Sequence, residues 1–392
     1  MWYWDAPKIV FGEDAIDYLE QVNGTKAFIV TDKVMEELGF VDIVINKLTK
    51  SNIDTKVFNE VEPDPSVQTV RKGGEICSEY KPDLIIGLGG GSAMDAAKAI
   101  DFIYEQPDMK LEDLSPFVQF KLHQKCKIIQ IPTTSGTGAE VTWAVVLTDT
   151  KDRRKLLLAS REIVADIAII DPIFPLKMPP SLTASTGLDA LTHAIEGYAS
   201  IWKNIYSDAM CLKATELVFE NLEKAVKNGS DIKVRENMHN AATMAGLGFG
   251  NSQAGIAHSM GHAIGAVFHK PHGICVGIAL PYIVEYAIST ADEPKKLFAE
   301  ISRKSLSIVE DDDFEASKQL VSRIRKLMKD IGAPTSYREL EISEDEFNKN
   351  FDLVIRNADQ DSCTSTFRPM PSKEDFQELF KAAYEGTSYL NK

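Results

Sequence analysis

Short apolar runs rich in β-branched residues alternate with amphipathic stretches in the first half of the chain. The candidate strands are residues 26–30, 54–58, 83–89, 127–132 and 165–171, and helical periodicity covers 33–50, 66–80 and 92–105 between them. This alternation is typical of βαβ units, in which helices cover both faces of a parallel sheet. The pattern predicts a doubly wound α/β domain over residues 1–180.

The pattern changes near Ser181 to long helical windows that Gly, Asn or Pro separate, with few β-branched runs. It predicts an all-α domain over residues 181–392, with the boundary inside 175–185. Residues 240–268 contain no Asp, Glu, Lys or Arg, yet many Gly, Asn, Gln, Ser and His. A helix facing lipid could not satisfy these polar groups, so we expect a buried, functional helix pair and no membrane span.

Composition narrows the class of protein. The net charge of −15 is unfavourable for a surface that binds nucleic acid or an anionic membrane, because such surfaces need clustered Lys and Arg. The five cysteines contain no CxxC pair and are odd in number, which predicts small buried thiols in a reducing compartment rather than disulfides. The first residues have an acid at position 5 and lack the apolar run of a signal peptide. We therefore expect a cytoplasmic protein.

A glycine run follows the third candidate strand, in the segment DLIIGLGGGSAMDAAK at 83–98. Gly89, Gly90 and Gly91 would let backbone N–H groups approach a pyrophosphate at a helix N-terminus. Ser92 and Asp95 have the spacing of an N-cap pair that opens this helix. The alternative is a plain tight turn between strand and helix.

Two further features fit a dinucleotide. The loop PTTSGTGAE at 132–140 follows another strand, and parallel sheets bind ligands at the carboxyl ends of their strands. Asp32 ends a strand, where its carboxylate could accept the ribose hydroxyls and repel a 2′-phosphate, which predicts NAD rather than NADP. Its alternative role is a helix N-cap. Asp32 precedes Gly89, the reverse of the usual fingerprint order.

Six of the seven histidines fall within residues 193–272, which points to a metal site. Asp189 and His193 are at i and i+4, so both side chains can reach one ion, although a local Asp–His hydrogen bond is the alternative. His258 and His262 have the same spacing, and His269 and His272 follow after a turn. Helical spacing alone would pair His258 with His262. Three imidazoles and one carboxylate suit Fe(II) or Zn(II) with one position left open.

At four ordered segments the chain resembles the iron-containing (group III) alcohol dehydrogenases, whose fold is like that of dehydroquinate synthase. The segments are GGGSAMDAAK (89–98), IPTTSGTGAEVT (131–142), PPSLTASTGLDALTHAIEG (179–197) and GIAHSMGHAIGAVFHKPHG (255–273). The resemblance implies that the metal ligands are Asp189, His193, His258 and His272. It places His262 beside the nicotinamide and the substrate and not among the ligands. There an imidazole, which titrates near neutrality, could relay the proton to solvent.

The resemblance implies roles for other residues. Asp32 would meet the adenosine ribose, Gly89 to Ser92 the pyrophosphate, Thr133, Thr134 and Thr137 the other end of the cofactor, and Lys155 the nicotinamide ribose. The substrate pocket would be lined by Trp143, Ala144, Phe249 and Cys363. A homodimer, formed through the N-terminal strand, is implied in the same way.

These expectations together indicate hydride transfer between a primary alcohol or diol, or the corresponding aldehyde, and a nicotinamide dinucleotide, with Fe(II) or alternatively Zn(II). One alternative is a polyol or polyol-phosphate dehydrogenase, or a synthase, of the same fold. Those enzymes need basic residues for charged substrates, whereas residues 236–269 contain no Lys or Arg and Lys270 is the only one near the ligand loop. A second alternative is a non-enzymatic NAD-binding regulator, against which a complete ligand set argues.

Overall fold

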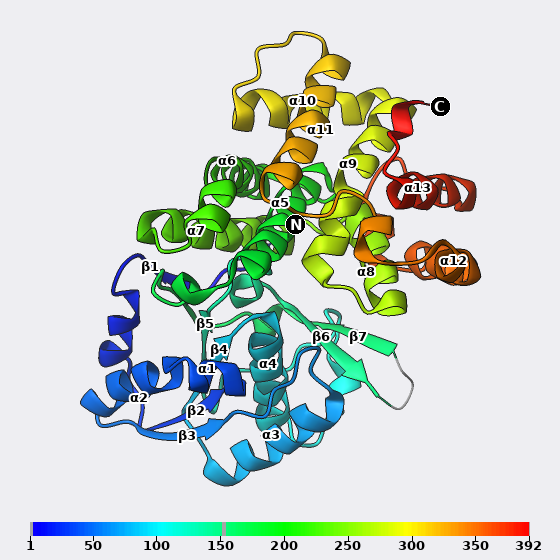
Figure 1. Cartoon of the computed structure of the whole chain (residues 1–392). Coiled ribbons are helices and arrows are strands. Elements are labelled where there is room, and N and C mark those ends of the chain that lie inside the picture. Colours follow the sequence, from blue (N-terminus) through cyan, green and yellow to red (C-terminus); the bar gives the residue numbers. More distant parts are fainter. Residues whose placement is uncertain (1–2, 151–153, 392) are drawn as a thin grey trace. The chain divides into compact units, whose positions relative to one another are not determined.

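The computed structural model of the chain describes residues 3–150 and 154–391, without the side chains of Arg154 and Lys155 (Figure 1). Contacts between residues divide the chain into two compact units, Met1–Leu176 and Lys177–Lys392. This division lies close to the boundary at residue 180 that the sequence suggests.

A six-stranded parallel sheet forms the centre of the first unit. Its order is β1-β8-β5-β4-β2-β3. The strands are β1 (Lys8–Phe11), β2 (Lys26–Val30), β3 (Asp54–Phe58), β4 (Leu84–Gly89), β5 (Lys127–Pro132) and β8 (Ile167–Ile170). The predicted parallel sheet is thus confirmed.

Helices cover both faces of this sheet. Along β2, Ala27 and Ile29 belong to one apolar core, whereas Phe28 and Val30 belong to another. The helices are α1 (Lys33–Glu37), α2 (Phe40–Lys50), α3 (Val67–Tyr80) and α4 (Gly91–Glu105). Successive strand side chains point to opposite faces, so both faces need a cover. The single helix predicted over 33–50 is wrong in one respect: it is interrupted at Gly39, which has a φ of 77°.

The first unit also contains a two-stranded antiparallel sheet that the sequence pattern does not predict. It consists of β6 (Ala144–Asp149) and β7 (Arg154–Ala159). Residues 150–153 read TKDR and contain none of the Asn-Gly or Asp-Gly pairs that announce a hairpin, which explains the omission.

The second unit is helical, as predicted, and its described residues contain no strand. Its helices are α5 (Pro180–Ala199), α6 (Ile205–Lys227), α7 (Ile232–Gly250), α8 (Ile256–Phe268), α9 (His272–Thr290), α10 (Asp292–Leu306), α11 (Asp313–Asp330), α12 (Glu344–Asp359) and α13 (Lys373–Glu385). Short 3-10 helices in the chain occupy Ala15–Gln21, Leu111–Asp113, Ala139–Val141, Arg161–Ile163, Pro175–Lys177, Arg338–Leu340, Ser362–Thr366 and Tyr389–Asn391. The charge-free stretch 240–268 forms the end of α7 and all of α8, and most of its residues are buried.

Helix α9 runs through the core of the second unit. Among the described residues it alone is long and apolar enough to cross a membrane, with a mean hydropathy of 1.5. However, 89% of that window is buried inside the protein, as in the central helix of a folded domain. All five cysteines are free and buried, which confirms the prediction of small buried thiols.

Candidate metal centre and dinucleotide-binding site

Three of the predicted metal ligands converge in the second unit. Asp189 lies on α5, His258 on α8 and His272 at the first position of α9. One ligand atom from each lies within 4.8 Å of the others. Asp189 Oδ1 is 3.7 Å from His258 Nε2 and 3.3 Å from His272 Nε2. Asp189 and His258 are buried, whereas the His272 side chain is 43% exposed, so the cluster has one accessible side.

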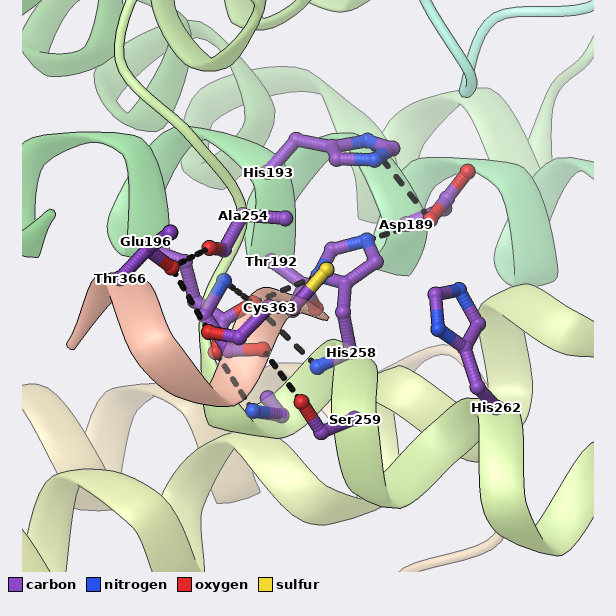
Figure 2. Close-up of polar contacts among 12 residues, drawn as sticks. Asp189, Thr192, His193, Glu196, Ala254, His258, Ser259, His262, Cys363 and Thr366 are labelled. Atoms are coloured by element: carbon purple, nitrogen blue, oxygen red, sulfur yellow. Dashed lines mark hydrogen bonds and ion pairs between the residues drawn. The ribbon is translucent and has the colours of Figure 1, made fainter. Parts of the chain in front are cut away.

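His193, the fourth predicted ligand, lies one helical turn after Asp189. Its Nδ1 is 3.7 Å from Asp189 Oδ1 (Figure 2). Its ring stacks on His258, with 4.4 Å between centroids, and on Phe249, with 3.9 Å between centroids. His193 therefore contacts the carboxylate of the cluster and lies beside, rather than among, the three mutually close ligands.

A buried glutamate that sequence reasoning missed holds His258 in place. Glu196 on α5 accepts hydrogen bonds from the backbone N–H groups of Gly255 (2.9 Å), Ala257 (2.5 Å) and His258 (3.3 Å). Its Oε2 is also 2.6 Å from His258 Nδ1. The carboxylate thus caps the N-terminus of α8, where backbone N–H groups lack helical partners. Asp189, His193 and Glu196 are at i, i+4 and i+7, a spacing along one helix face that could have revealed it.

The contact with Glu196 assigns the tautomer of His258. A proton on Nδ1 that is donated to Glu196 leaves the lone pair on Nε2, which faces Asp189. Asp189 Oδ1 and His258 Nε2 are buried, and neither forms a hydrogen bond with any described residue. Buried polar atoms in proteins are normally hydrogen-bonded or bound to a metal. The donor set therefore fits a divalent ion.

The electrostatics of the cluster are consistent with this fit. Burial alone would raise the pKa of Asp189, but the imidazoles of His193 and His272 hold it well below its usual range. Burial would lower the pKa of His258, yet Asp189 and Glu196 raise it to about 9. Without an ion the cluster therefore retains a proton on His258, and a metal must displace that positive charge.

Close packing of α9 against α5 brings His272 to the cluster. A Cβ atom on Gly273 would lie 2.2 Å from the carbonyl oxygen of Ser185, and one on Gly277 would lie 2.9 Å from Leu188 Cβ. Only glycine lets the two backbones approach this closely. Ser185 is one turn before Asp189, so this contact sets the position of the neighbouring His272.

His262 lies one turn after His258 on α8, and its side chain is 42% exposed. Its Nδ1 is 2.9 Å from Asp361 Oδ2, and its ring centroid is 5.2 Å from that of His272. Helical spacing alone would pair it with His258, but its partner is Asp361. Cys363, a predicted pocket residue, is buried and offers its Sγ within 4.8 Å of donor atoms of His262 and Asp361. Phe249, also a predicted pocket residue, stacks on His193. The other two predicted pocket residues, Trp143 and Ala144, belong to the first unit.

The glycine run of the first unit connects β4 to α4. Gly89 has a φ of 151°, and a Cβ there would lie 2.7 Å from Ala93 Cβ. The predicted capping by Ser92 and Asp95 is wrong. Helix α4 has Gly90 as its N-cap and begins at Gly91, which places Ser92 inside the first turn, and Asp95 accepts a hydrogen bond from the Val146 N–H instead. No described side chain caps α4, so its N-terminal N–H groups suit an anion.

The second loop lies against this glycine turn because β4 and β5 are neighbours. Thr133 N–H donates to the Gly89 carbonyl at 2.9 Å. Thr134 Oγ1 would be 3.5 Å from a Cβ on Gly90, and Thr137 Cγ2 would be 3.0 Å from one on Gly91. The Thr133 hydroxyl is buried and has no hydrogen-bond partner among the described residues, so it can bind a ligand. The side chain of Lys155 lies outside the described part of the structure.

Asp32 follows β2, the other neighbour of β4. One carboxylate oxygen caps α1 by accepting from Val34 N (2.8 Å) and Met35 N (3.1 Å). The other would be 3.7 Å from a Cβ on Gly89. Asp32 is thus an N-cap, the alternative role that the sequence offered, and its other oxygen lies beside the glycine turn. The sheet order explains why the acid precedes the glycines in sequence.

Family models match both units of the chain. Residues 6–172 match the iron-containing alcohol dehydrogenase model, and residues 183–384 match the C-terminal model of the same family. The chain belongs to the iron-containing alcohol dehydrogenase family.

Relatives of this chain match nearly its whole length. It is 39% identical over 381 residues to the NADPH-dependent butanol dehydrogenase of Clostridium saccharobutylicum, and the match covers 97% of each chain. It is 39% identical to the aldehyde-alcohol dehydrogenase of Streptococcus pneumoniae serotype 4, over 97% of this chain and 45% of that protein. The chain therefore spans about half the length of this second relative.

A solved 1,3-propanediol oxidoreductase superposes with a TM-score of 0.91 at 30% identity, covering 98% of this chain and all of that one. Membership in the family confirms the predicted fold and the predicted class, an alcohol dehydrogenase that uses a metal and a nicotinamide cofactor.

Proposed function

We propose that the protein interconverts a short primary alcohol or diol and its aldehyde, with Fe(II), or alternatively Zn(II), held by Asp189, His193, His258 and His272. The observation that carries this proposal is the convergence of Asp189, His258 and His272 on one point, buried except on the side of His272, in a member of this family. A bound ion supplies Lewis acidity to an alcohol or carbonyl oxygen.

A neutral substrate is favoured by the residues around the cluster. Residues 236–269, which include α8, contain no Lys or Arg to pair with a phosphate or carboxylate. Phe249 and Cys363 supply apolar surface beside His193 and His262. The relatives are named for butanol and 1,3-propanediol, which supports short alcohols and diols.

The dinucleotide would bind in the first unit, with its pyrophosphate at Gly89, Gly90, Gly91 and Ser92. The uncapped N-terminus of α4 supplies backbone N–H donors there. The hydroxyl of Thr133, together with Thr134 and Thr137, would contact the cofactor further along. Lys155 is proposed for the nicotinamide ribose from the family pattern alone.

His262 is proposed to exchange the substrate proton with solvent. Its side chain is 42% exposed, and its Nδ1 is anchored by Asp361. We expect His262→Gln to lower kcat by about 100-fold, as loss of a general acid–base group does, while the metal content stays unchanged. A parallel loss of metal would identify His262 as a ligand instead.

The preference for NAD over NADP is proposed from Asp32, whose carboxylate lies beside the glycine turn. The butanol dehydrogenase relative is NADPH-dependent, so the choice needs a direct test. In Asp32→Ser the hydroxyl still caps α1 but the negative charge is removed. Loss of a charge repulsion of about 1–3 kcal/mol should raise the ratio of kcat/KM for NADP over NAD by about 10- to 100-fold. An unchanged ratio would show that Asp32 acts only as a helix cap.

The decisive experiment is anaerobic purification followed by addition of Fe(II) or Zn(II). Turnover is then measured on primary alcohols, diols and aldehydes with NAD and NADP, alongside glycerol and a polyol phosphate. We expect metal-dependent turnover of the neutral short substrates. Turnover of the phosphorylated substrate alone would replace this proposal with the polyol-phosphate alternative, and no turnover with metal bound would favour a regulator.

We also propose a homodimer in the cytoplasm, formed through β1. This strand is at the edge of the sheet, and Phe11 on it is 65% exposed. Exposed edge strands pair readily with another chain. Sedimentation equilibrium of the wild type and of Phe11→Lys tests this contact, because a monomeric wild type would contradict it.

A further inference from the structure

A second group of metal-binding residue types lies in the first unit, in a different domain from the residues proposed for catalysis. Asp101 and Glu105 are one turn apart near the end of α4, and Cys126 immediately precedes β5. One donor atom from each of these three lies within 4.8 Å of the others. His123, three residues before Cys126, adds an imidazole whose Nε2 is 3.6 Å from Asp101 Oδ2.

The group is buried and incompletely hydrogen-bonded. Asp101 is fully buried, Cys126 is 4% exposed and Glu105 is 6% exposed. Asp101 Oδ2 and His123 Nε2 are both buried, and neither forms a hydrogen bond with any described residue. A buried carboxylate without a full set of partners is costly, which points to a ligand that contacts it.

The neighbouring lysine does not neutralise this group. Lys125 directs its Nζ to the backbone carbonyls of Tyr104 (2.6 Å) and Glu105 (3.1 Å). Two buried carboxylates and a thiol thus face one imidazole, and a divalent cation would balance their charge.

We propose that Asp101, Glu105, His123 and Cys126 bind a structural zinc ion. Tetrahedral zinc, with bonds of about 2.3 Å to sulfur and about 2.0 Å to oxygen or nitrogen, separates its donor atoms by about 3.5 Å. The distances here bracket that value: Cys126 Sγ is 3.0 Å from Asp101 Oδ1 and 3.8 Å from Glu105 Oε1. His123 Nε2, 3.6 Å from Asp101 Oδ2, would supply the fourth donor.

Surrounding contacts fix two of these ligands in a suitable orientation. His123 Nδ1 is 3.4 Å from Asp166 Oδ2, and the same oxygen accepts from Ile128 N at 2.9 Å. A carboxylate on Nδ1 leaves Nε2 for the metal, as in many zinc sites. Glu105 Oε1 is held by Lys125 N (2.7 Å) and Cys126 N (3.1 Å).

Four protein ligands leave no open position, so this zinc would tie the end of α4 to the segment that enters β5 rather than bind substrate. A thiolate ligand favours zinc over the harder ions. A cysteine binds zinc as the thiolate, so binding releases the proton of the Cys126 thiol. Zinc uptake should therefore release protons and weaken in acid.

Metal counting separates this site from the proposed catalytic one. The full-length chain is loaded with zinc, desalted and measured by mass spectrometry for zinc per chain. We expect two equivalents in the wild type, one in His272→Ala, one in Cys126→Ser and none in the double variant. A single equivalent in the wild type that Cys126→Ser leaves in place would overturn the proposal.

Cobalt substitution of the wild type gives a readout that does not depend on variant folding. Of the two proposed metal sites, only the second contains a thiolate ligand, so the Co(II)-loaded wild type should show a sulfur-to-cobalt charge-transfer band in the near-ultraviolet that Cys126→Ser removes. The band should persist in Cys77→Ser, which replaces another buried cysteine of the same unit, and in His272→Ala. Absence of the band from the Co(II)-loaded wild type would overturn the proposal, as would a band that survives Asp101→Asn and Cys126→Ser.

Discussion

Replacement of Glu196 by Gln tests how the second unit orients a metal ligand. Glu196 is 1% exposed and its two oxygens accept from three backbone N–H groups and from His258 Nδ1. A glutamine keeps the shape of the side chain but turns one oxygen into a donor. In either orientation at least one N–H of the α8 N-terminus then faces the amide nitrogen.

The expected loss of stability follows from the number of hydrogen bonds that Glu196 accepts. One unsatisfied buried donor costs about 1–3 kcal/mol, and the remaining bonds lose the strength that a charged acceptor gives. Loss of the negative charge at the α8 N-terminus adds about 0.3–2 kcal/mol. We expect the metal-free Glu196→Gln variant to be about 3–5 kcal/mol less stable than the wild type. Metal affinity should fall by about 10- to 100-fold, as it does when the partner of a metal-bound imidazole is removed.

Urea denaturation of the metal-free protein measures the stability, and competition with a chelator measures metal affinity. Glu223→Gln is the control, because Glu223 is a half-exposed residue on α6 paired with Lys227 and should change stability by about 1 kcal/mol or less. A Glu196→Gln variant whose metal affinity equals that of the wild type would refute the orienting role. Unchanged stability would refute the capping role.

Three further substitutions follow from the contacts. His272→Ala should abolish metal binding and turnover together, and wild-type metal content with full turnover would exclude His272 as a ligand. Gly273→Ala should push α9 away from Ser185 on α5, lowering stability by about 1–3 kcal/mol and weakening metal binding, whereas Gly265→Ala, with its nearest atom at 3.4 Å, should be tolerated. Asp83 accepts from Thr25 N, Thr25 Oγ1 and Lys26 N, and these bonds lower its pKa although burial raises it. Ionised Asp83 therefore stabilises the fold above about pH 4, and this contribution is lost as the pH falls through the lowered pKa. Asp83→Asn should reduce the loss of stability in acid. Urea denaturation at a series of pH values measures this difference.

The sequence by itself determined the fold class and most element positions. The β-branched runs at 26–30, 54–58 and 127–132 coincide with β2, β3 and β5. The central strands β2 and β5 are largely apolar because both of their faces are buried, whereas the edge strand β3 keeps polar residues. The helices after Ser181 were equally readable from their periodicity. The ordered motifs were sufficient to identify the family, since they combine a glycine turn with a histidine-rich, charge-free stretch.

Local sequence rules did not predict the start of α4 or the β6–β7 hairpin. Ser92 is a good N-cap, yet α4 begins at Gly91, because β4 delivers the chain to the helix through Gly89 and Gly90. The sequence between β6 and β7 contains no Asn-Gly or Asp-Gly pair, so the sequence pattern did not predict this hairpin. In these cases the choice was made by long-range packing rather than by propensity.

Helical periodicity did not decide which side chains share the metal cluster; the family motifs indicated them, and the tertiary structure shows the physical reason. Along α8 the spacing pairs His258 with His262, but His262 contacts Asp361, about a hundred residues later in the chain. His272 reaches Asp189 because Gly273 lets α9 touch α5, and Glu196 reaches His258 because α5 meets the N-terminus of α8. Periodicity describes one helix at a time, whereas a metal site depends on the distance between helices, and that distance is fixed by packing.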